Sequence, residues 1–302
     1  MALHLAEPDQ LQIGTEPPYD AEPVDWPFNA TKAYLLDEAS LAETATRFAS
    51  PIDELYIGGY EEQAHESVFF IQQTFCAILP QIPHDHPGHV KLAKLVVDLM
   101  NRPSPSGAAH QDGGSRNNLP WADLRAPECR YSQGPADEMV KLEKRGGEYY
   151  PQYETDGAKL GVGAIKAEWT RHNAFLARLV TTPGALDYEK YALISMQGAL
   201  EESAKTAEEI SANVPAAAVW IFYAGEHIYK SRREWSERWT PAQGGPLWNG
   251  KKGFCPERWA LWKDRFQWVT MQENTTDEAR EFAGKAVRKM SEIESLVGNT
   301  DG

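Results

Sequence analysis

The sequence predicts an all-α protein, a single compact multi-helix domain of about nine or ten helices with long irregular loops and an extended acidic N-terminal arm. Apolar residues recur with the 3.6-residue period of a helix along much of the chain. Capping boxes of the form Ser/Thr-x-x-Glu precede several of these stretches. No stretch sustains the period-2 alternation of β-branched and aromatic residues that marks a strand.

Residues 1–28 are predicted to form the irregular acidic arm. They contain five prolines and six acidic residues but no lysine or arginine. A secretory signal requires a basic start and an apolar core, and a mitochondrial presequence requires arginine and few acids. Because the segment fits neither, we expect a cytoplasmic protein. The helical domain is expected to span residues 29–302.

Helices of the N-terminal half are predicted from a cap, from periodicity and from prolines. Ser40 and Glu43 form a capping box that opens the first predicted helix. Residues 61–79 follow a 3.6-residue rhythm, which Pro80 ends. Pro87 suits the first position of the next helix.

Two long irregular stretches follow. Residues 101–134 contain four prolines and four glycines, and residues 146–163 contain five glycines. Loops of this length are uncommon and are usually functional or disordered. We therefore expect a sub-boundary of the helical domain within 101–163.

Helices of the C-terminal half have recognisable starts. Asp187 is placed to cap one helix, and Thr206 and Thr275 each begin a capping box. Another helix is predicted to open at Asn213 and Pro215. It is apolar on every side, so we expect it to run through the middle of the fold.

The composition excludes several classes of function. The chain carries 44 acidic and 30 basic residues, a net charge of −14, so binding to nucleic acid or to anionic membranes is not expected. No apolar run reaches the roughly 18–20 residues of a membrane helix. The three cysteines are too widely spaced for a disulfide framework or a zinc pattern, which favours a reducing compartment.

Charge and tryptophan are distributed unevenly. Residues 1–60 carry a net charge of −9, whereas residues 220–268 carry +4 and seven of the ten tryptophans. Such a cluster suits an aromatic-walled pocket, although core packing is the simpler interpretation for Trp259 and Trp262. Trp248, in a glycine-rich loop, is the best candidate for ligand contact. The acidic arm is predicted to cover this segment as a lid or a brace.

Titratable residues accompany these tryptophans. His227 follows the apolar helix, where desolvation and the helix dipole can tune an acid or base; carbonyl capping is the competing interpretation. His172 is predicted to face inward, where a hydrogen-bonded core histidine is the competing interpretation. The predicted catalytic residues are His172, His227, Tyr223 and Glu226. The predicted binding residues are Trp169, Trp220, Trp248, Trp259, Trp262 and Arg265.

No motif identifies a cofactor or a metal, and none is predicted. His84, His86 and His89 form H-x-H-x-x-H, but on a proline-broken connection rather than a rigid frame. Residues 62–65 have the Glu-x-x-His spacing of a di-iron site without its second half. Residues 245–252 match a phosphate loop only in part, because lysine replaces Ser/Thr and no strand precedes them.

Several segments resemble a family of filamentous-fungal proteins of unknown function. They are residues 173–179 (NAFLARL), 214–225 (VPAAAVWIFYAG), 244–254 (GGPLWNGKKGF) and 257–262 (ERWALW). The resemblance is good over roughly 165–290 and weaker over 60–125. It implies a mainly helical, cytosolic protein that is sometimes encoded beside genes of secondary metabolism, and it supplies no catalytic residues.

These observations favour a soluble helical protein that binds a hydrophobic or aromatic small molecule. The hypothesis extends to a cofactor-independent step in fungal secondary metabolism, such as cyclisation, isomerisation or dehydration. The protein would hold one substrate conformation beside an acid or base. The alternative is a non-enzymatic module that docks a protein partner through a Trp-rich, locally basic face.

Overall fold

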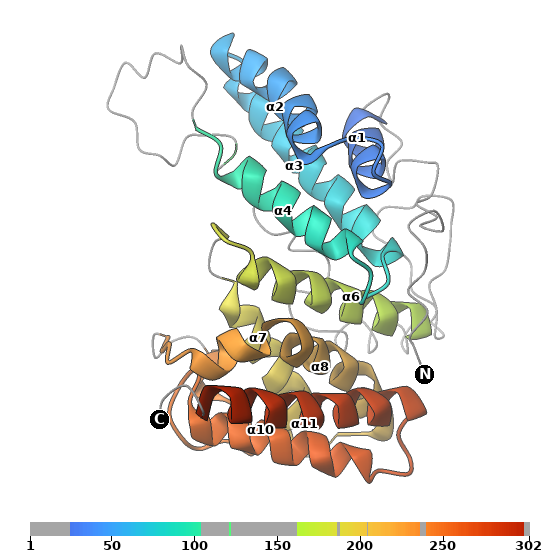
Figure 1. Cartoon of the computed structure of the whole chain (residues 1–302), viewed down its shortest axis with the longest axis vertical. Helices are drawn as coiled ribbons and strands as arrows, with labels where there is room; N and C mark the ends of the chain where they lie inside the picture. The colour runs from blue at the N-terminus through green and yellow to red at the C-terminus, as the bar shows by residue number, and fades with distance from the viewer. Residues whose placement is uncertain are drawn as a thin grey trace. The chain divides into compact units, whose positions relative to one another are not determined.

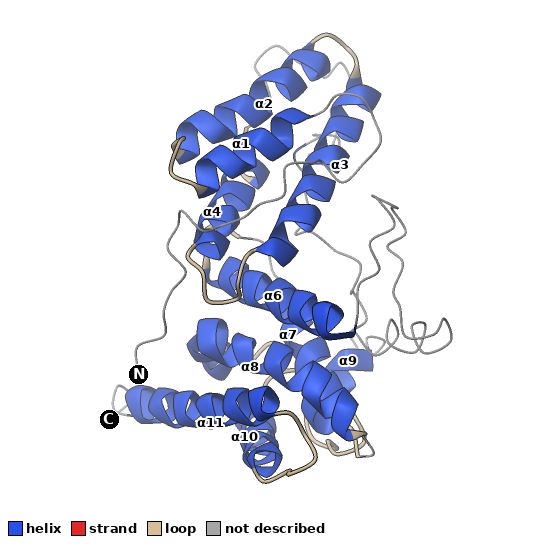
Figure 2. Cartoon of the chain, turned by 90° about the vertical axis from the view of Figure 1, so that its right-hand side faces the viewer, coloured by secondary structure: helices blue, strands red, loops and turns tan. Residues whose placement is uncertain are grey.

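The computed structural model describes residues 25–103, 121, 162–185, 188–203, 205–235 and 240–298. Every regular element in these ranges is a helix (Figure 2), and they contain no strand. The all-α prediction is therefore confirmed.

The chain divides into two compact units, whose helices can be followed by colour in Figure 1. The first contains α1 (Asp25–Leu35), α2 (Leu41–Ile57), α3 (Glu61–Ile78) and α4 (Gly88–Met100). The second contains α6 (Val162–Thr181), α7 (Glu189–Met196), α8 (Ala207–Lys230), α9 (Thr240–Gln243), α10 (Pro256–Thr270) and α11 (Asp277–Gly298). The main change of unit falls between α4 and α6, in the interval 101–163. The single domain over 29–302 stays a prediction.

The first helix begins inside the segment assigned to the arm. α1 starts at Asp25, so residues 25–28 are helical rather than irregular, a correction to the predicted start at residue 29. Pro27 is tolerated because the first turn of a helix has no partner for that N–H. Phe28 is buried, and burial of its ring outweighs the acidic, proline-rich composition. Residues 1–24 lie outside the described residues.

An aromatic contact joins three helices of the first unit. α2 begins at the predicted capping box, in which Ser40 Oγ accepts from Glu43 N (3.2 Å) and Glu43 Oε2 accepts from Ser40 N (2.8 Å). Phe48 of α2 is fully buried. Its ring centre lies 5.3 Å from that of Trp26 on α1 and 5.8 Å from that of Phe75 on α3.

Prolines mark the ends of the next two helices. α3 ends at Ile78, and Pro80 lies in a short 3₁₀ turn, Leu79–Gln81. Pro87 immediately precedes α4 instead of being its first residue. The predictions for this region therefore hold to within one residue, the usual uncertainty of a helix boundary.

The longest helix, α8, is continuous across Pro215. It begins at the predicted capping box of Thr206, whose Oγ1 accepts from Glu209 N. The separate helix predicted to open at Asn213 and Pro215 is not formed, because the proline costs the helix one hydrogen bond while both flanks remain buried. Residues 210–221 are all buried, and α8 packs between α6 and α11, so it runs through the middle of its unit as predicted.

The last helix is capped one residue later than predicted. α11 starts at Asp277, and Thr276 Oγ1 accepts from Ala279 N (3.2 Å). Thr275 Oγ1 donates to Gln272 O instead, because this residue belongs to the preceding turn. Asp187, the predicted cap of α7, lies outside the described residues.

Candidate functional site

His172 is buried on α6. Its residue is 6% exposed, and its ring lies nearly parallel to that of Trp169, 6.3 Å away. Nδ1 of His172 is buried and has no hydrogen-bond partner among the described residues. Burial lowers the pKa of His172 to about 4, because the imidazolium would lose its hydration. The side chain is therefore neutral at neutral pH.

The neighbouring residue, Asn173, is a polar hub that the sequence did not single out. Its Oδ1 accepts hydrogen bonds from Trp220 Nε1 (2.7 Å) and from Ser195 Oγ (2.5 Å), and its Nδ2 donates to Trp169 O (2.9 Å). Trp220 is fully buried. This arrangement joins α6, α7 and α8 in the core, so Trp220 has a packing role in the described structure.

His227 is paired with a carboxylate. Its Nε2 lies 2.5 Å from Glu189 Oε1, and Ser231 Oγ donates to Glu189 Oε2 (3.0 Å). The hydrogen bond from His227 is the main cause of the lowered pKa of Glu189. A carboxylate that orients an imidazole is an arrangement used by general bases. The catalytic role of His227 stays a prediction.

The other two predicted catalytic residues have separate partners. Glu226 is exposed and pairs with Lys230 one turn further along α8 (2.6 Å). Tyr223 lies beneath the guanidinium of Arg178, whose carbon is 3.4 Å from the ring centre. The described contacts of the four predicted catalytic residues therefore lead to different neighbours.

A buried ion pair lies at the centre of the Trp-rich segment. Glu201 and Arg258 are both fully buried. Arg258 Nε donates to Glu201 Oε1 (2.7 Å) and Nη2 to Oε2 (2.9 Å), a bidentate pair. Trp262 Nε1 also donates to Oε1 (2.6 Å), and Gly245 N donates to Oε2 (2.8 Å). Arg258 Nη1 donates to the backbone oxygens of Ala242 and Gly253.

Hydrogen bonds therefore occupy both carboxylate oxygens and three guanidinium nitrogens. Desolvation of two charges is tolerated when the pair is well aligned and its remaining groups are bonded. Glu201 is the last residue of a π-helical turn, Gln197–Glu201, which follows α7. No sequence motif marks this glutamate, because its partners lie 44, 57 and 61 residues away.

The glycine-rich loop is folded around this ion pair. A Cβ on Gly245 would lie 2.8 Å from Glu201 O, and one on Gly250 would lie 2.4 Å from the ring of Trp248. Gly253 has φ +80°. Trp248 Nε1 donates to Lys251 O within the same loop (2.9 Å). Close backbone packing thus accounts for the glycines of the partial phosphate-loop pattern. Trp248 itself is half-buried.

The remaining predicted binding residues lie on α10. Trp259 Nε1 donates to Glu294 Oε1 (2.8 Å), and Lys263 Nζ pairs with Oε2 of the same carboxylate (2.5 Å). Arg265 Nε donates to Leu200 O (3.1 Å), and its guanidinium lies 4.1 Å from the ring centre of Trp268. Burial lowers the pKa of Arg265. Trp259 and Trp262 are buried, as the core-packing interpretation expects.

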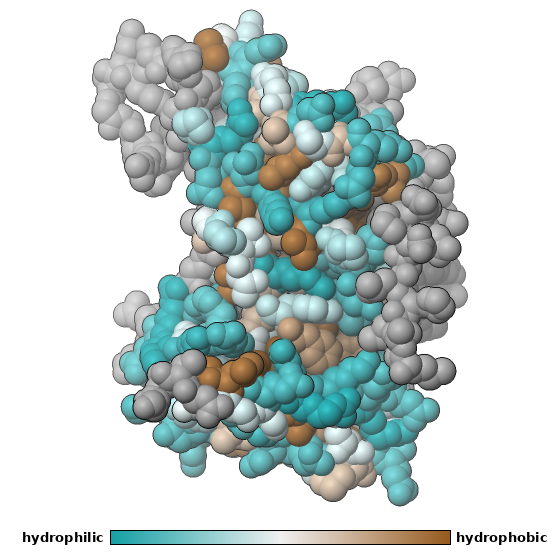
Figure 3. All heavy atoms as spheres, viewed as in Figure 1, coloured by the Kyte–Doolittle hydropathy of each residue, from teal (hydrophilic) through white to brown (hydrophobic). Residues whose placement is uncertain are grey.

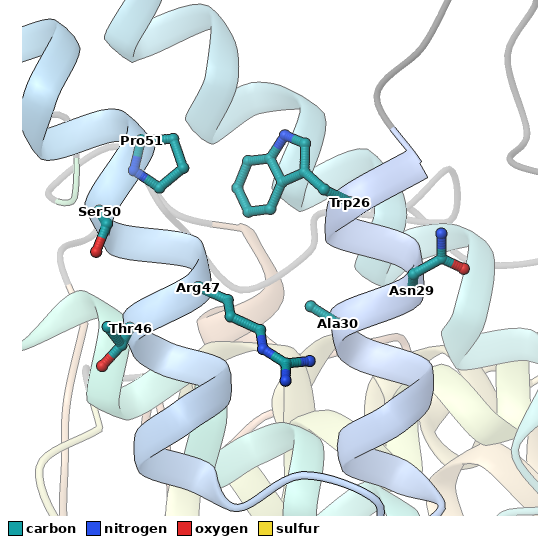
Figure 4. Close-up of a pocket in the computed structure, with 7 residues that line it drawn as sticks. All are labelled: Trp26, Asn29, Ala30, Thr46, Arg47, Ser50 and Pro51. Atoms are coloured by element: carbon teal, nitrogen blue, oxygen red, sulfur yellow. The ribbon is translucent and has the colours of Figure 1, made fainter.

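A groove with a volume of about 800 Å³ lies in the first unit, between α1 and α2. Its lining residues are Trp26, Asn29, Ala30, Thr46, Arg47, Ser50 and Pro51. Figure 4 shows Trp26 and Ala30 of α1 facing Pro51 and Arg47 of α2 across the gap, while Asn29, Thr46 and Ser50 point away from it. The Trp26 ring also makes a T-shaped contact with the buried ring of Phe48.

Arg47 is the one charged residue among the described residues of the lining. It is exposed, and within the described part of the chain it has no ion-pair partner. Glu43, one turn earlier, uses its Oε2 in the capping box with Ser40. Sequence reasoning missed this groove because Trp26 was assigned to the arm. A usable signal was present, since Lys32 and Arg47 are the only basic residues among the first 60.

The histidine cluster has structural contacts. His86 Nδ1 accepts from Gly88 N (2.9 Å), and His89 Nε2 lies 3.2 Å from Ile82 O. Burial lowers the pKa of His86. In the described ranges, no three side chains of the metal-binding types gather at one point.

The cysteines differ from one another in state. Cys255 is free and buried, and burial raises the pKa of its thiol. Cys76 is disulfide-bonded, a bond that the spacing argument against a disulfide framework did not predict. The argument from cysteine spacing to a reducing compartment is weakened accordingly.

The matched family covers most of the second unit. Residues 73–266 match the family described as "Protein of unknown function (DUF3632)". The chain belongs to the DUF3632 family. The DUF3632 match includes Glu201, Arg258 and all ten predicted site residues, whereas α1, α2 and their groove lie outside it. Comparison with curated proteins and with solved structures found no match.

The described helices do not meet the requirements of a membrane span. None of them combines the length and the apolar character that crossing a bilayer requires. On the face drawn in Figure 3, hydrophobic side chains form small groups among hydrophilic ones.

Proposed function

We propose that this protein binds a hydrophobic or aromatic small molecule in the groove between α1 and α2. The observation that carries the proposal is the open face of Trp26, set opposite Pro51 with Ala30 beside it. Apolar walls with a few polar groups at the edge are the usual composition of small-molecule sites, and about 800 Å³ lies within their usual range.

The partly buried state of Trp26 supports this site. Its ring makes a T-shaped contact with Phe48, so the indole is held in place before a ligand arrives. A preorganised aromatic surface loses little conformational entropy on binding. By contrast, Trp220, Trp259 and Trp262 are buried and donate their N–H groups to Asn173, Glu294 and Glu201.

Catalysis is the finer part of the proposed function. The acid–base pair that supports it, His227 with Glu189, lies in the second unit and not in the groove, so the catalytic proposal concerns a separate site. A cyclisation, isomerisation or dehydration needs no more than such a pair and a held substrate. Replacing His172 and His227 together by alanine is expected to abolish turnover; full turnover in the double variant contradicts the catalytic role. The fungal and secondary-metabolic setting rests on the family resemblance alone.

The test of binding uses a neutral aromatic probe, N-phenyl-1-naphthylamine, whose fluorescence rises in apolar surroundings. Titration of the full chain is expected to show saturable binding that Trp26→Ala weakens about tenfold, because an aromatic contact and its buried area are lost. Trp26→Phe keeps a ring and is expected to retain most of the affinity. Thermal melts of both variants check that α1 stays folded.

Trp248→Ala is the matched comparison, because Trp248 is the half-buried tryptophan of the segment favoured by the sequence. We expect this variant to bind the probe as the unmodified chain does. If Trp248→Ala loses binding while Trp26→Ala keeps it, the site lies in the Trp-rich segment and the groove proposal is wrong.

A further inference from the structure

We propose that the ligand of the α1/α2 groove carries an anionic group, and that Arg47 binds this group. This inference rests on the proposed function, since it names the class of molecule that the same groove takes. The ligand is thus an amphiphile with an aromatic or hydrophobic body and a carboxylate, sulfonate or phosphate.

The state of Arg47 is the first observation. In the same unit, Lys91 pairs with Asp37 (2.6 Å) and Arg102 with Asp53 (3.6 Å). Arg47 has no such partner in the ranges that the structure describes, although it lies in an acidic part of the sequence. A guanidinium offers several donors in a planar fork that suits the oxygens of a carboxylate or phosphate.

The nearest acid along α2 is already engaged. Glu43 Oε2 accepts from both the backbone N and the Oγ of Ser40, at 2.8 Å and 2.7 Å. These bonds lower the pKa of Glu43, with a smaller effect from the charge of Arg47. Capping of α2 therefore holds Glu43 at the helix start, and Arg47 remains open to a ligand.

The position of Arg47 gives the ligand an orientation. Figure 4 shows its guanidinium in the gap below the Trp26 ring, on the side of Ala30. Among the lining residues that the structure describes, none is acidic and would repel an anion. An aromatic body against Trp26 and Pro51 can thus place an anionic group at Arg47, where a charge-assisted hydrogen bond forms.

The experiment compares two probes that differ by one sulfonate, 8-anilino-1-naphthalenesulfonate and N-phenyl-1-naphthylamine. Both are titrated into the full chain by fluorescence. Arg47→Gln is expected to weaken sulfonate binding about fivefold, the upper end for an exposed ion pair, and to leave the neutral probe unaffected. Arg47→Lys is expected to restore part of the sulfonate affinity. Raising the salt concentration should reduce the difference between the probes.

Lys94→Gln is the matched control. Lys94 is exposed on α4, does not line the groove, and its replacement changes the net charge by the same amount. If Lys94→Gln weakens sulfonate binding as much as Arg47→Gln does, the effect is one of net charge and the inference is overturned. Equal weakening of both probes by Arg47→Gln also overturns it, because Arg47 then supports the groove wall.

The two proposals fail in different ways. Suppose that Trp26→Ala weakens the binding of both probes and Arg47→Gln weakens the binding of neither. The groove then binds small molecules, but the inference that its ligand carries an anionic group is wrong. If Trp26→Ala leaves both probes unaffected, the groove is not the binding site, and the proposed function fails together with the inference.

Discussion

Arg258 and Arg47 each lie near a tryptophan, but in opposite environments. Arg258 is fully buried, paired with Glu201 and bonded to two backbone oxygens, and Trp248 and Trp262 lie beside its guanidinium. Arg47 is exposed on a groove beside Trp26, with no ion-pair partner in the described ranges. Residue types that look alike in the sequence therefore differ in how many of their hydrogen bonds are already made.

This difference separates a structural cluster from a binding site. A buried guanidinium whose three nitrogens all donate hydrogen bonds has little capacity left for a ligand, whereas an open donor beside an apolar wall retains it. The DUF3632 match contains the buried ion pair of Arg258 and leaves out the groove with Arg47. The ion pair thus lies in the part of the chain that matches the family, and the groove in the part that does not.

The largest expected effect on stability comes from breaking the buried ion pair of Glu201 and Arg258. Glu201→Ala leaves Arg258 charged, buried and without its carboxylate, so we expect a loss of about 3–5 kcal/mol in the free energy of unfolding. Urea denaturation followed by circular dichroism measures it. Glu226→Ala removes an exposed glutamate from α8 of the same unit and should leave the midpoint unchanged. Similar midpoints for the two variants would show that the ion pair contributes no stability.

An effect of intermediate size comes from His172, a buried group whose Nδ1 has no hydrogen-bond partner among the described residues. Its pKa is about 4 in the folded chain and near 6.5 when exposed, so between these values the unfolded state binds the extra proton. Stability should therefore fall by about 3 kcal/mol as the pH drops from 6.5 to 4. His172→Gln is expected to remove this part of the pH dependence, measured by denaturation at several pH values. An unchanged pH profile would contradict the burial of a neutral imidazole.

The smallest expected effect on stability is that of replacing Arg47. Arg47→Gln removes an exposed cation that has no ion-pair partner in the described chain, so the denaturation midpoint should not move. Arg258→Gln, measured in parallel, should reduce stability nearly as much as Glu201→Ala does. If Arg47→Gln lowers the denaturant concentration at the midpoint of unfolding, then Arg47 has a structural role. Its effect on ligand binding must in that case be compared with a thermal melt of the same variant.

The helices were largely predictable, because their signals are local. The capping boxes of Ser40 and Thr206 act over three residues and form as predicted. The errors also have local causes: Pro215 lies inside α8 since buried flanks outweigh one lost hydrogen bond, and Thr276 caps α11 because Thr275 bonds to the preceding turn. Trp26 was placed in the arm because proline and acidic residues dominated its surroundings.

The sequence by itself determined an all-α chain with a buried central helix and a Trp-rich, locally basic segment. The tertiary structure decided which polar groups are occupied. It joined Glu201 to partners as far as 61 residues away and placed Trp26 opposite Pro51 across two helices. Caps and periodicity depend on neighbours along the chain, whereas the pairing of a buried charge or the opening of a groove depends on packing between helices.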